Sequence, residues 1–155
     1  MKKLLIVIAS LIIMTGCATS GGYKQPDESV PFATITNPAP TVISQFNWQK
    51  YFVQKIDGEE VDYSKEFWSS NGAYGAVRRI SPGTHNFVIR CTFNNNGTGK
   101  YVGFIDIEAE LEPGINYELV GPLSGKTMDA YFINSETGKK AKQSSIPINN
   151  VPSKS

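Results

Sequence analysis

The chain has few of the residues that bind metals or form covalent cross-links. Its 155 residues include two cysteines and one histidine, whereas a zinc site usually needs several Cys and His ligands. Fifteen Lys and Arg side chains nearly balance fourteen Asp and Glu side chains, so there is no basic excess of the kind that binds nucleic acid. No glycine-rich phosphate loop, nucleophile elbow or paired acid and base is visible. We therefore expect no metal, no cofactor, no nucleic-acid partner and no enzymatic activity.

The chain also lacks a long hydrophobic run, and its one short run lies at the N-terminus. Lys2 and Lys3 precede an unbroken stretch of apolar and small residues at 4–14, and Gly16 and Cys17 follow. A membrane-spanning helix needs about 20 apolar residues, so this stretch is too short to span a bilayer. A positive start, a short apolar core and a small residue at its end are the features of a secretory signal peptide.

This signal ends in a cysteine, and Met14-Thr15-Gly16-Cys17 resembles the lipobox of bacterial lipoproteins. The resemblance implies that residues 1–16 are removed as a signal peptide. It also implies that the Cys17 thiol is diacylglycerylated and that the new amino terminus is acylated, as palmitate labelling would detect. Two acyl chains suffice for stable anchoring, because each buried CH₂ contributes about 0.8 kcal/mol and one chain is marginal. The alternative, a buried strand or helix, is disfavoured by the two lysines and the Gly-Cys ending.

The same resemblance implies a location. In lipoproteins of Gram-negative cells, an Asp directly after the lipidated cysteine often retains the protein in the inner membrane. Ala18 occupies that position here. The resemblance therefore implies a protein of the bacterial cell envelope, anchored to the outer membrane and facing the periplasm. The expected partners are the membrane, through the lipid anchor, and another envelope protein.

The mature chain divides by composition into a tether, one domain and a tail. Residues 17–44 contain four prolines among Gly, Ser and Thr and show no sustained period. We expect this segment to be an acylated flexible tether that spans about 25–30 Å. The alternative is a first strand within residues 30–43, where residues 32–36 alternate. We expect residues 45–140 to form the folded domain. The polar residues 141–155 are expected to be a disordered tail.

Strand and turn patterns follow one another through the expected domain. Asp57-Gly58 between two strand-like runs is typical of a type I′ hairpin turn, which needs positive φ at both central residues. Clean alternation over 86–93 and 101–111 predicts two longer strands. Short strands at regular spacing, with little helical periodicity, predict an all-β protein with an antiparallel β-sandwich of the immunoglobulin or transthyretin-like type.

The order of these turns resembles that of small bacterial lipoproteins with a PEGA-like or transthyretin-like β-domain. The resemblance rests on an Ile-Asp-Gly hairpin at 56–58, the run 80–85, Pro113-Gly114 and Tyr117-Glu118-Leu119. It covers roughly residues 54–138. It implies a fold and brings no catalytic residue with it.

His85 and Cys91 are the first pair to test for nucleophilic chemistry. They are six residues apart on one predicted strand, which separates them by about 20 Å at ~3.3 Å per residue. Hydrogen-bond reach is ~3 Å, so they cannot pair within the strand. Since Cys91 alternates with Phe87, Ile89 and Phe93, we expect it to be a buried small hydrophobic residue rather than a free reactive thiol. We interpret His85 as an ordinary polar residue at the start of a strand.

An acidic stripe lies on the opposite face of the second long strand. Asp106, Glu108 and Glu110 alternate with apolar residues and are expected to point outward. Carboxylate oxygens bind calcium or a basic partner, but three carboxylates spaced along a straight strand are too far apart for one ion. We favour a solvated face that pairs across the sheet with Arg78, Arg79 or Arg90.

The best candidates for partner contact are Phe67, Trp68 and Asn71, in a predicted loop at 64–72. Large aromatics in a small β-domain are more often core residues, but aromatic residues exposed on loops serve binding. The sequence thus predicts a membrane-anchored, non-catalytic β-domain with a structural or protein-interaction role in the periplasm. The alternative is a module that binds a glycan or a small envelope molecule through this aromatic loop.

Overall fold

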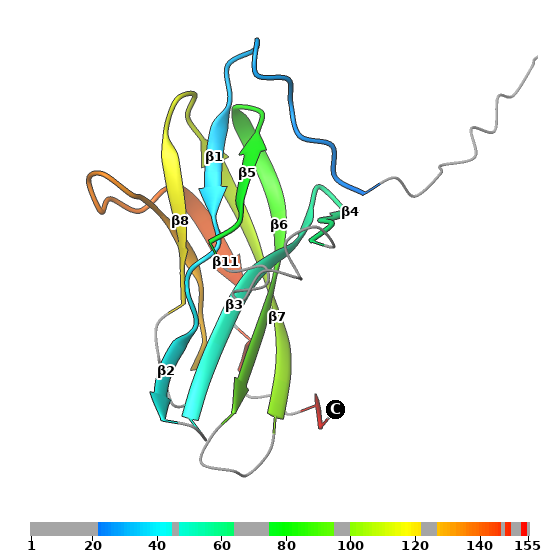
Figure 1. The fold of residues 1–155 in the computed structure, drawn as a ribbon, viewed down its shortest axis with the longest axis vertical. Helices are drawn as coiled ribbons and strands as arrows, with labels where there is room; N and C mark the ends of the chain where they lie inside the picture. Colours follow the sequence, from blue (N-terminus) through cyan, green and yellow to red (C-terminus); the bar gives the residue numbers. More distant parts are fainter. Residues whose placement is uncertain are drawn as a thin grey trace, which may run out of the picture.

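A computed structural model describes residues 22–44, 47–63, 75–94, 100–121, 127–146, 148–149 and 153–154. Every regular element in these ranges is a strand, and most of the strands form two sheets that pack face to face (Figure 1). The predicted all-β sandwich is therefore confirmed. In the part of the chain that the structure describes, there is no helix with the length and apolarity needed to cross a membrane.

The first sheet has four strands. All its neighbours are antiparallel except the central pair, which is parallel and joins Thr34–Thr36 to Asn116–Glu118. In spatial order the strands are β10 (Tyr131–Asn134), β8 (Asn116–Val120), β1 (Ala33–Thr36) and β5 (Val77–Ile80).

The second sheet is larger and antiparallel throughout. Two short strands add to it at its sides: β4 (Glu59–Glu60) pairs with β3, and β13 (Ser153–Lys154) pairs with β7. A separate small ladder joins β12 (Ile148–Asn149) to β9 (Thr127–Met128). The main strands, in spatial order, are β11 (Lys142–Ile146), β7 (Lys100–Leu111), β6 (Gly83–Asn94), β3 (Asn47–Ile56) and β2 (Thr41–Ser44).

The core lies between the two sheets and is built by the alternation that the sequence shows. Phe87, Ile89 and Cys91 of β6 are at most 1% exposed, and the intervening side chains point to the other face. The Phe87 ring meets the Phe132 ring of β10 edge-on, with 4.8 Å between centroids. Because side chains alternate across a strand, one run of residues supplies both the core and an outer surface.

The predicted hairpin at Asp57-Gly58 is confirmed. Asp57 has φ of 51° and Gly58 has φ of 86°, as a type I′ turn requires. The return strand β4 is only two residues long. A bulge in β3 between Val53 and Lys55 interrupts the ladder, and beyond β4 the Val61 N–H donates to the Gln54 carbonyl at 2.8 Å.

The expected tether over residues 17–44 is wrong where the structure describes it, from Gly22 onward, and most clearly in its second half. β1 lies inside the first sheet, and Ala33 and Ile35 belong to the core. Pro38 and Pro40 lie between β1 and β2, where the chain passes from the first sheet to the second. The alternation over 32–36 was the more informative signal, because prolines between strands stop the ladder without preventing the strand before them.

Asn37 holds this crossing in place. Its side chain is buried; its Oδ1 accepts from the Val53 N–H at 3.1 Å, and its Nδ2 donates to the Tyr63 hydroxyl at 3.0 Å. The Tyr63 hydroxyl in turn donates to the Val53 carbonyl at 2.8 Å. On the same edge of β3, the short strand β2 pairs with residues 47–49 and the short strand β4 pairs with residues 55–56. Val53 lies between these two ladders, so side chains rather than a strand form hydrogen bonds with its backbone.

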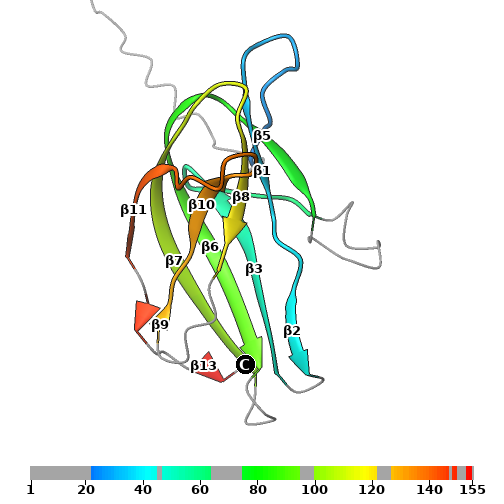
Figure 2. The ribbon, with the colours of Figure 1, turned by 90° about the vertical axis from the view of Figure 1, so that its left-hand side faces the viewer.

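The expected disordered tail over 141–155 is also wrong, because β11, β12 and β13 within it all pair with other strands. β11 pairs with β7 from Lys142↔Glu110 to Ile146↔Asp106. Figure 2 shows the side of the sandwich where the chain passes from β10 to β11, and there the Ala141 N–H donates to the Phe132 carbonyl at 2.9 Å. A polar composition does not prevent this pairing, because ladder hydrogen bonds join backbone groups.

Candidate functional site

The residues chosen from the sequence as sites lie outside the described residues. These are the lipidation residue Cys17 and the loop residues Phe67, Trp68 and Asn71. Their roles stay predictions. The described residues instead present a candidate surface on the second sheet, which includes the acidic stripe and strands on either side of it.

The outer face of β6, β7 and β11 combines acidic and apolar side chains, and we call it the acidic–apolar face. The strand register places Asp106 between Val88 and Ile146, and Glu108 between Asn86 and Ser144. The face therefore draws on three strands that are adjacent in space but separated in sequence. Its members are Asn86 and Val88 of β6; Phe104, Asp106, Glu108 and Glu110 of β7; and Lys142, Ser144 and Ile146 of β11.

The acidic part of this face has a lysine partner rather than the expected arginines. The Lys142 Nζ lies 2.6 Å from the Glu110 Oε2, and this hydrogen bond raises the pKa of Lys142. Arg78 and Arg79 lie on β5 in the other sheet, and Arg90 pairs in register with Phe104. The expected arginine pairing is thus wrong, because β5 belongs to the other sheet and the register puts Arg90 beside an apolar residue.

The apolar part of the face exposes large side chains to solvent. Ile146 is 72% exposed and Phe104 is 43% exposed. Opposite Phe104, on the neighbouring strand β6, the Arg90 guanidinium lies over the Phe52 ring of β3, 5.8 Å from its centroid. Scattered apolar residues on a surface are ordinary, but here they adjoin a row of carboxylates on a pleated sheet.

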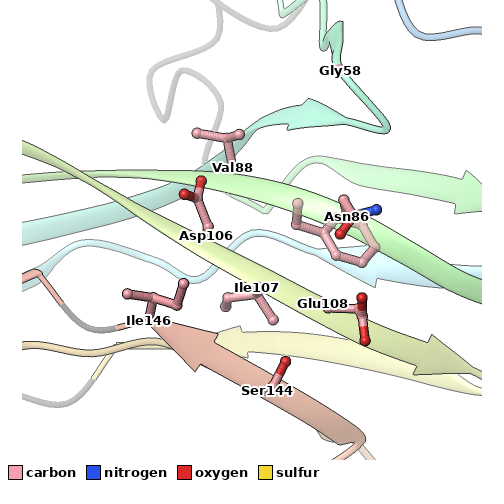
Figure 3. Close-up of a pocket in the computed structure, with 9 residues that line it drawn as sticks. Gly58, Asn86, Val88, Asp106, Ile107, Glu108, Ser144 and Ile146 are labelled. Carbon is pink, nitrogen blue, oxygen red and sulfur yellow. The ribbon is translucent and has the colours of Figure 1, made fainter.

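Two hollows lie on this face. The larger, of about 390 Å³, is lined by residues that include Val88, Asp106 and Ile146. Figure 3 shows Asp106 and Glu108 on the central strand, with Val88 and Asn86 on one side and Ile146 and Ser144 on the other. The smaller hollow, of about 260 Å³, also includes Glu108 and Ser144 in its lining. The two hollows are therefore adjacent parts of one surface.

The geometry does not make this face a metal centre. Alternate residues of a strand lie about 6.6 Å apart along the strand axis. Calcium binds each oxygen ligand at about 2.3–2.6 Å, so two oxygens on one ion are at most about 5 Å apart. Among the residues that the structure describes, no three His, Cys, Asp or Glu side chains are grouped so as to hold a metal ion. What the face offers chemically is hydrogen-bond acceptors, negative charge and apolar contact area.

His85 and Cys91 belong to separate environments. The His85 Nδ1 lies 2.7 Å from the Asp57 Oδ2, and its Nε2 lies 2.7 Å from the Ser81 carbonyl oxygen. Cys91 lies in the core, where its Sγ donates to the Gly103 carbonyl at 3.3 Å. Burial raises the pKa of the Cys91 thiol to about 11, so the thiolate is disfavoured. The predicted burial of Cys91 is confirmed.

Asp57 has a structural role that the sequence did not reveal. Besides its contact with His85, its Oδ1 accepts from the Asn86 N–H at 2.9 Å. Burial opposes the charge on this carboxylate, but the hydrogen bonds from His85 and Asn86 prevail and lower the pKa of Asp57. The turn at Asp57 is thereby tied to the start of β6. The partners are 28 and 29 residues apart, and no local pattern indicates such a contact.

Sequence reasoning also missed Lys142, Ser144 and Ile146 as members of a surface. These three side chains are exposed and alternate with the less exposed Gln143 and Ser145, as expected for a strand. This alternation in the sequence was the available signal.

Comparisons with family models, with curated proteins and with solved structures found no significant match to this chain.

Proposed function

We propose that this protein is a lipid-anchored component of a bacterial cell envelope whose β-domain acts by protein contact, without catalysis. The anchor is Cys17, and the proposed location is the outer membrane, on its periplasmic side. The signal pattern that ends at Cys17 supports the anchor and the envelope location. Ala18 supports outer-membrane sorting through the resemblance to lipoproteins.

The observation that carries the contact role is the exposure of Ile146 and Phe104 beside the carboxylates of the acidic–apolar face. Covering apolar surface contributes about 25 cal/mol per Å² buried, so a partner that covers both side chains gains affinity. The carboxylates select among partners, because they favour basic groups and repel acidic surfaces. The proposed partner is an envelope protein that presents apolar residues together with Lys or Arg.

The anchor is tested by Cys17→Ser in the full-length chain. We expect the variant to lose palmitate labelling and lipoprotein-specific signal cleavage. Sucrose-gradient fractionation of the wild-type protein then tests the location. Normal labelling of Cys17→Ser would overturn the lipid anchor, and flotation of the wild type with inner-membrane markers would overturn the sorting.

The contact role is tested by site-specific photo-crosslinking in cells. A photoreactive side chain at Ser144 should give one dominant adduct with an envelope protein, and Ile146→Asp should abolish that adduct. A photoreactive side chain at Val77, an exposed residue on the first sheet, is the matched control and should give none. Equal adducts from both positions would refute the contact face. Glycan binding that Trp68→Ala abolishes would instead favour a ligand-binding module.

A further inference from the structure

The described N-terminal segment lies against the domain from Gly22 onward. The Tyr23 N–H donates to the Glu60 carbonyl of β4 at 2.7 Å. A Cβ added at Gly22 would lie 2.7 Å from the same carbonyl oxygen, which is closer than real Cβ contacts come. Gly22 therefore allows the segment to lie directly on the end of the β3–β4 hairpin.

The same segment covers the outer edge of β5. The Tyr23 hydroxyl donates to the Arg79 carbonyl at 3.0 Å, and the Arg79 N–H donates to the Gln25 Oε1 at 2.9 Å. Tyr23 also packs against the core. These bonds satisfy backbone groups at the edge of the first sheet, a place where unpaired groups otherwise recruit other chains. The segment is thus an edge cover and part of the domain.

This packing leaves a very short connection to Cys17. Five Cα-to-Cα steps separate Cys17 from Gly22, and a chain spans at most about 3.6 Å per step, or ~18 Å in total. The expected tether of 17–44 would have reached further. The charges of the hairpin do not attract it to a membrane in place of this connection. The hairpin carries Asp57, Glu59 and Glu60, and the Lys55 Nζ is paired with Glu60 at 3.0 Å.

We propose that the lipid anchor holds the β3–β4 hairpin against the membrane surface, so that the domain has a defined polarity on the bilayer. This inference rests on the acylation of Cys17 in the proposed function. In Figure 1 the chain enters the domain beside β4, at the right of the sandwich, whereas β2 lies lower and at the left. The hairpin is the membrane-proximal part of the domain, and β2 is distal. Because Gly58 lines the larger hollow, the acidic–apolar face begins near the membrane and extends away from it.

Lipid-dependent quenching tests this polarity on the full-length acylated protein. One variant carries a fluorophore at Glu59→Cys on the hairpin, and the matched variant carries it at Val42→Cys on β2; both positions are exposed. Buried Cys91 should not take the label. In phosphatidylcholine vesicles with nitroxide-labelled headgroups, we expect strong quenching at position 59 and weak quenching at position 42. Equal quenching in bound protein would overturn the proposal.

The same assay separates this inference from the lipid anchor. If the wild-type protein neither binds the vesicles nor carries acyl chains, the proposed function fails. If it binds but shows no contrast between the two positions, only the polarity fails. Added salt should leave the contrast unchanged, because a covalent connection is not screened as surface charges are. Loss of the contrast in salt would contradict the short-connection mechanism.

Two changes should remove the contrast by lengthening the connection. Gly22→Val displaces the segment from Glu60, so quenching at position 59 should fall toward that at position 42. Lys24→Gln changes an exposed residue of the same segment and should leave quenching unchanged. An insertion of about twelve Gly and Ser residues between 20 and 21 lengthens the connection without altering the domain. If this insertion leaves the contrast intact, the proposal is overturned even where Gly22→Val fails to fold.

Discussion

The inner and outer faces of the second sheet are built by the same strands but differ in burial and in the side chains that they carry. On the inner side of β7, Ile105, Ile107 and Ala109 are at most 1% exposed. On the outer side of the same strand, carboxylates alternate with them and remain in water. A slip of one residue in register would bury Asp106 and Glu108 and expose the isoleucines, so the inner face specifies the register. The outer face is free of that constraint and can serve recognition.

The largest difference between the faces should appear when an aromatic is truncated on each. Phe87→Ala removes a buried ring that packs on Phe132, and we expect it to lower the free energy of unfolding by about 3–5 kcal/mol. Phe104→Ala, on the outer face, should cost less than about 1 kcal/mol. Urea denaturation of the mature domain measures both. Comparable losses would show that Phe104 is as structural as Phe87.

A second prediction compares apolar and polar contributions to the interior. Asn37→Ala leaves the Val53 N–H without its side-chain acceptor and removes a donor to the Tyr63 hydroxyl. An unsatisfied buried polar group costs about 1–3 kcal/mol, so we expect a loss in that range. Tyr63→Phe, which also removes the donor to the Val53 carbonyl, is the companion variant. Wild-type stability in Asn37→Ala would mean that water replaces the side chain at the crossing.

A third prediction concerns acid stability at the hairpin, outside the apolar core. The lowered pKa of Asp57 stabilises the folded state at pH values above the unfolded value near 4. That contribution disappears as the pH falls through the lower folded value. Asp57→Asn tolerates the positive φ of the turn and should flatten this part of the stability profile, by less than about 1 kcal/mol because the site is half-exposed. An unchanged slope below pH 4 would contradict the role of Asp57.

The smallest effect on stability is expected for the ion pair on the acidic–apolar face. Lys142→Gln removes a contact between exposed side chains, and ion pairs on a protein surface contribute little to stability because water and salt screen them. We expect the melting temperature to change little and the crosslinked adduct at Ser144 to change in yield. A large fall in melting temperature would show that β11 depends on this pair and that the outer face also stabilises the fold.

The sequence predicted the parts of the fold that depend on neighbours in the chain. The alternation of β6 and β7 predicted both strands, their inner faces and the burial of Cys91. The type I′ turn at Asp57-Gly58 followed from the need for positive φ at two adjacent residues. The acidic stripe followed from the same alternation, and it lies on β7, one of the three strands that form the candidate face. Each of these features is encoded within a few residues.

Tertiary structure decided the features that join distant segments. β1 enters the first sheet in parallel with β8, more than 80 residues away, and β11 joins β7 from a segment whose polar composition suggested disorder. Backbone pairing depends weakly on side-chain identity, so composition could not reveal it. The sequence by itself determined which residues alternate, which turns form and where the proposed anchor lies. Only the tertiary structure decided that Gly22 reaches β4 and that Lys142 and Ile146 flank the carboxylates, because these contacts arise from folding the whole chain.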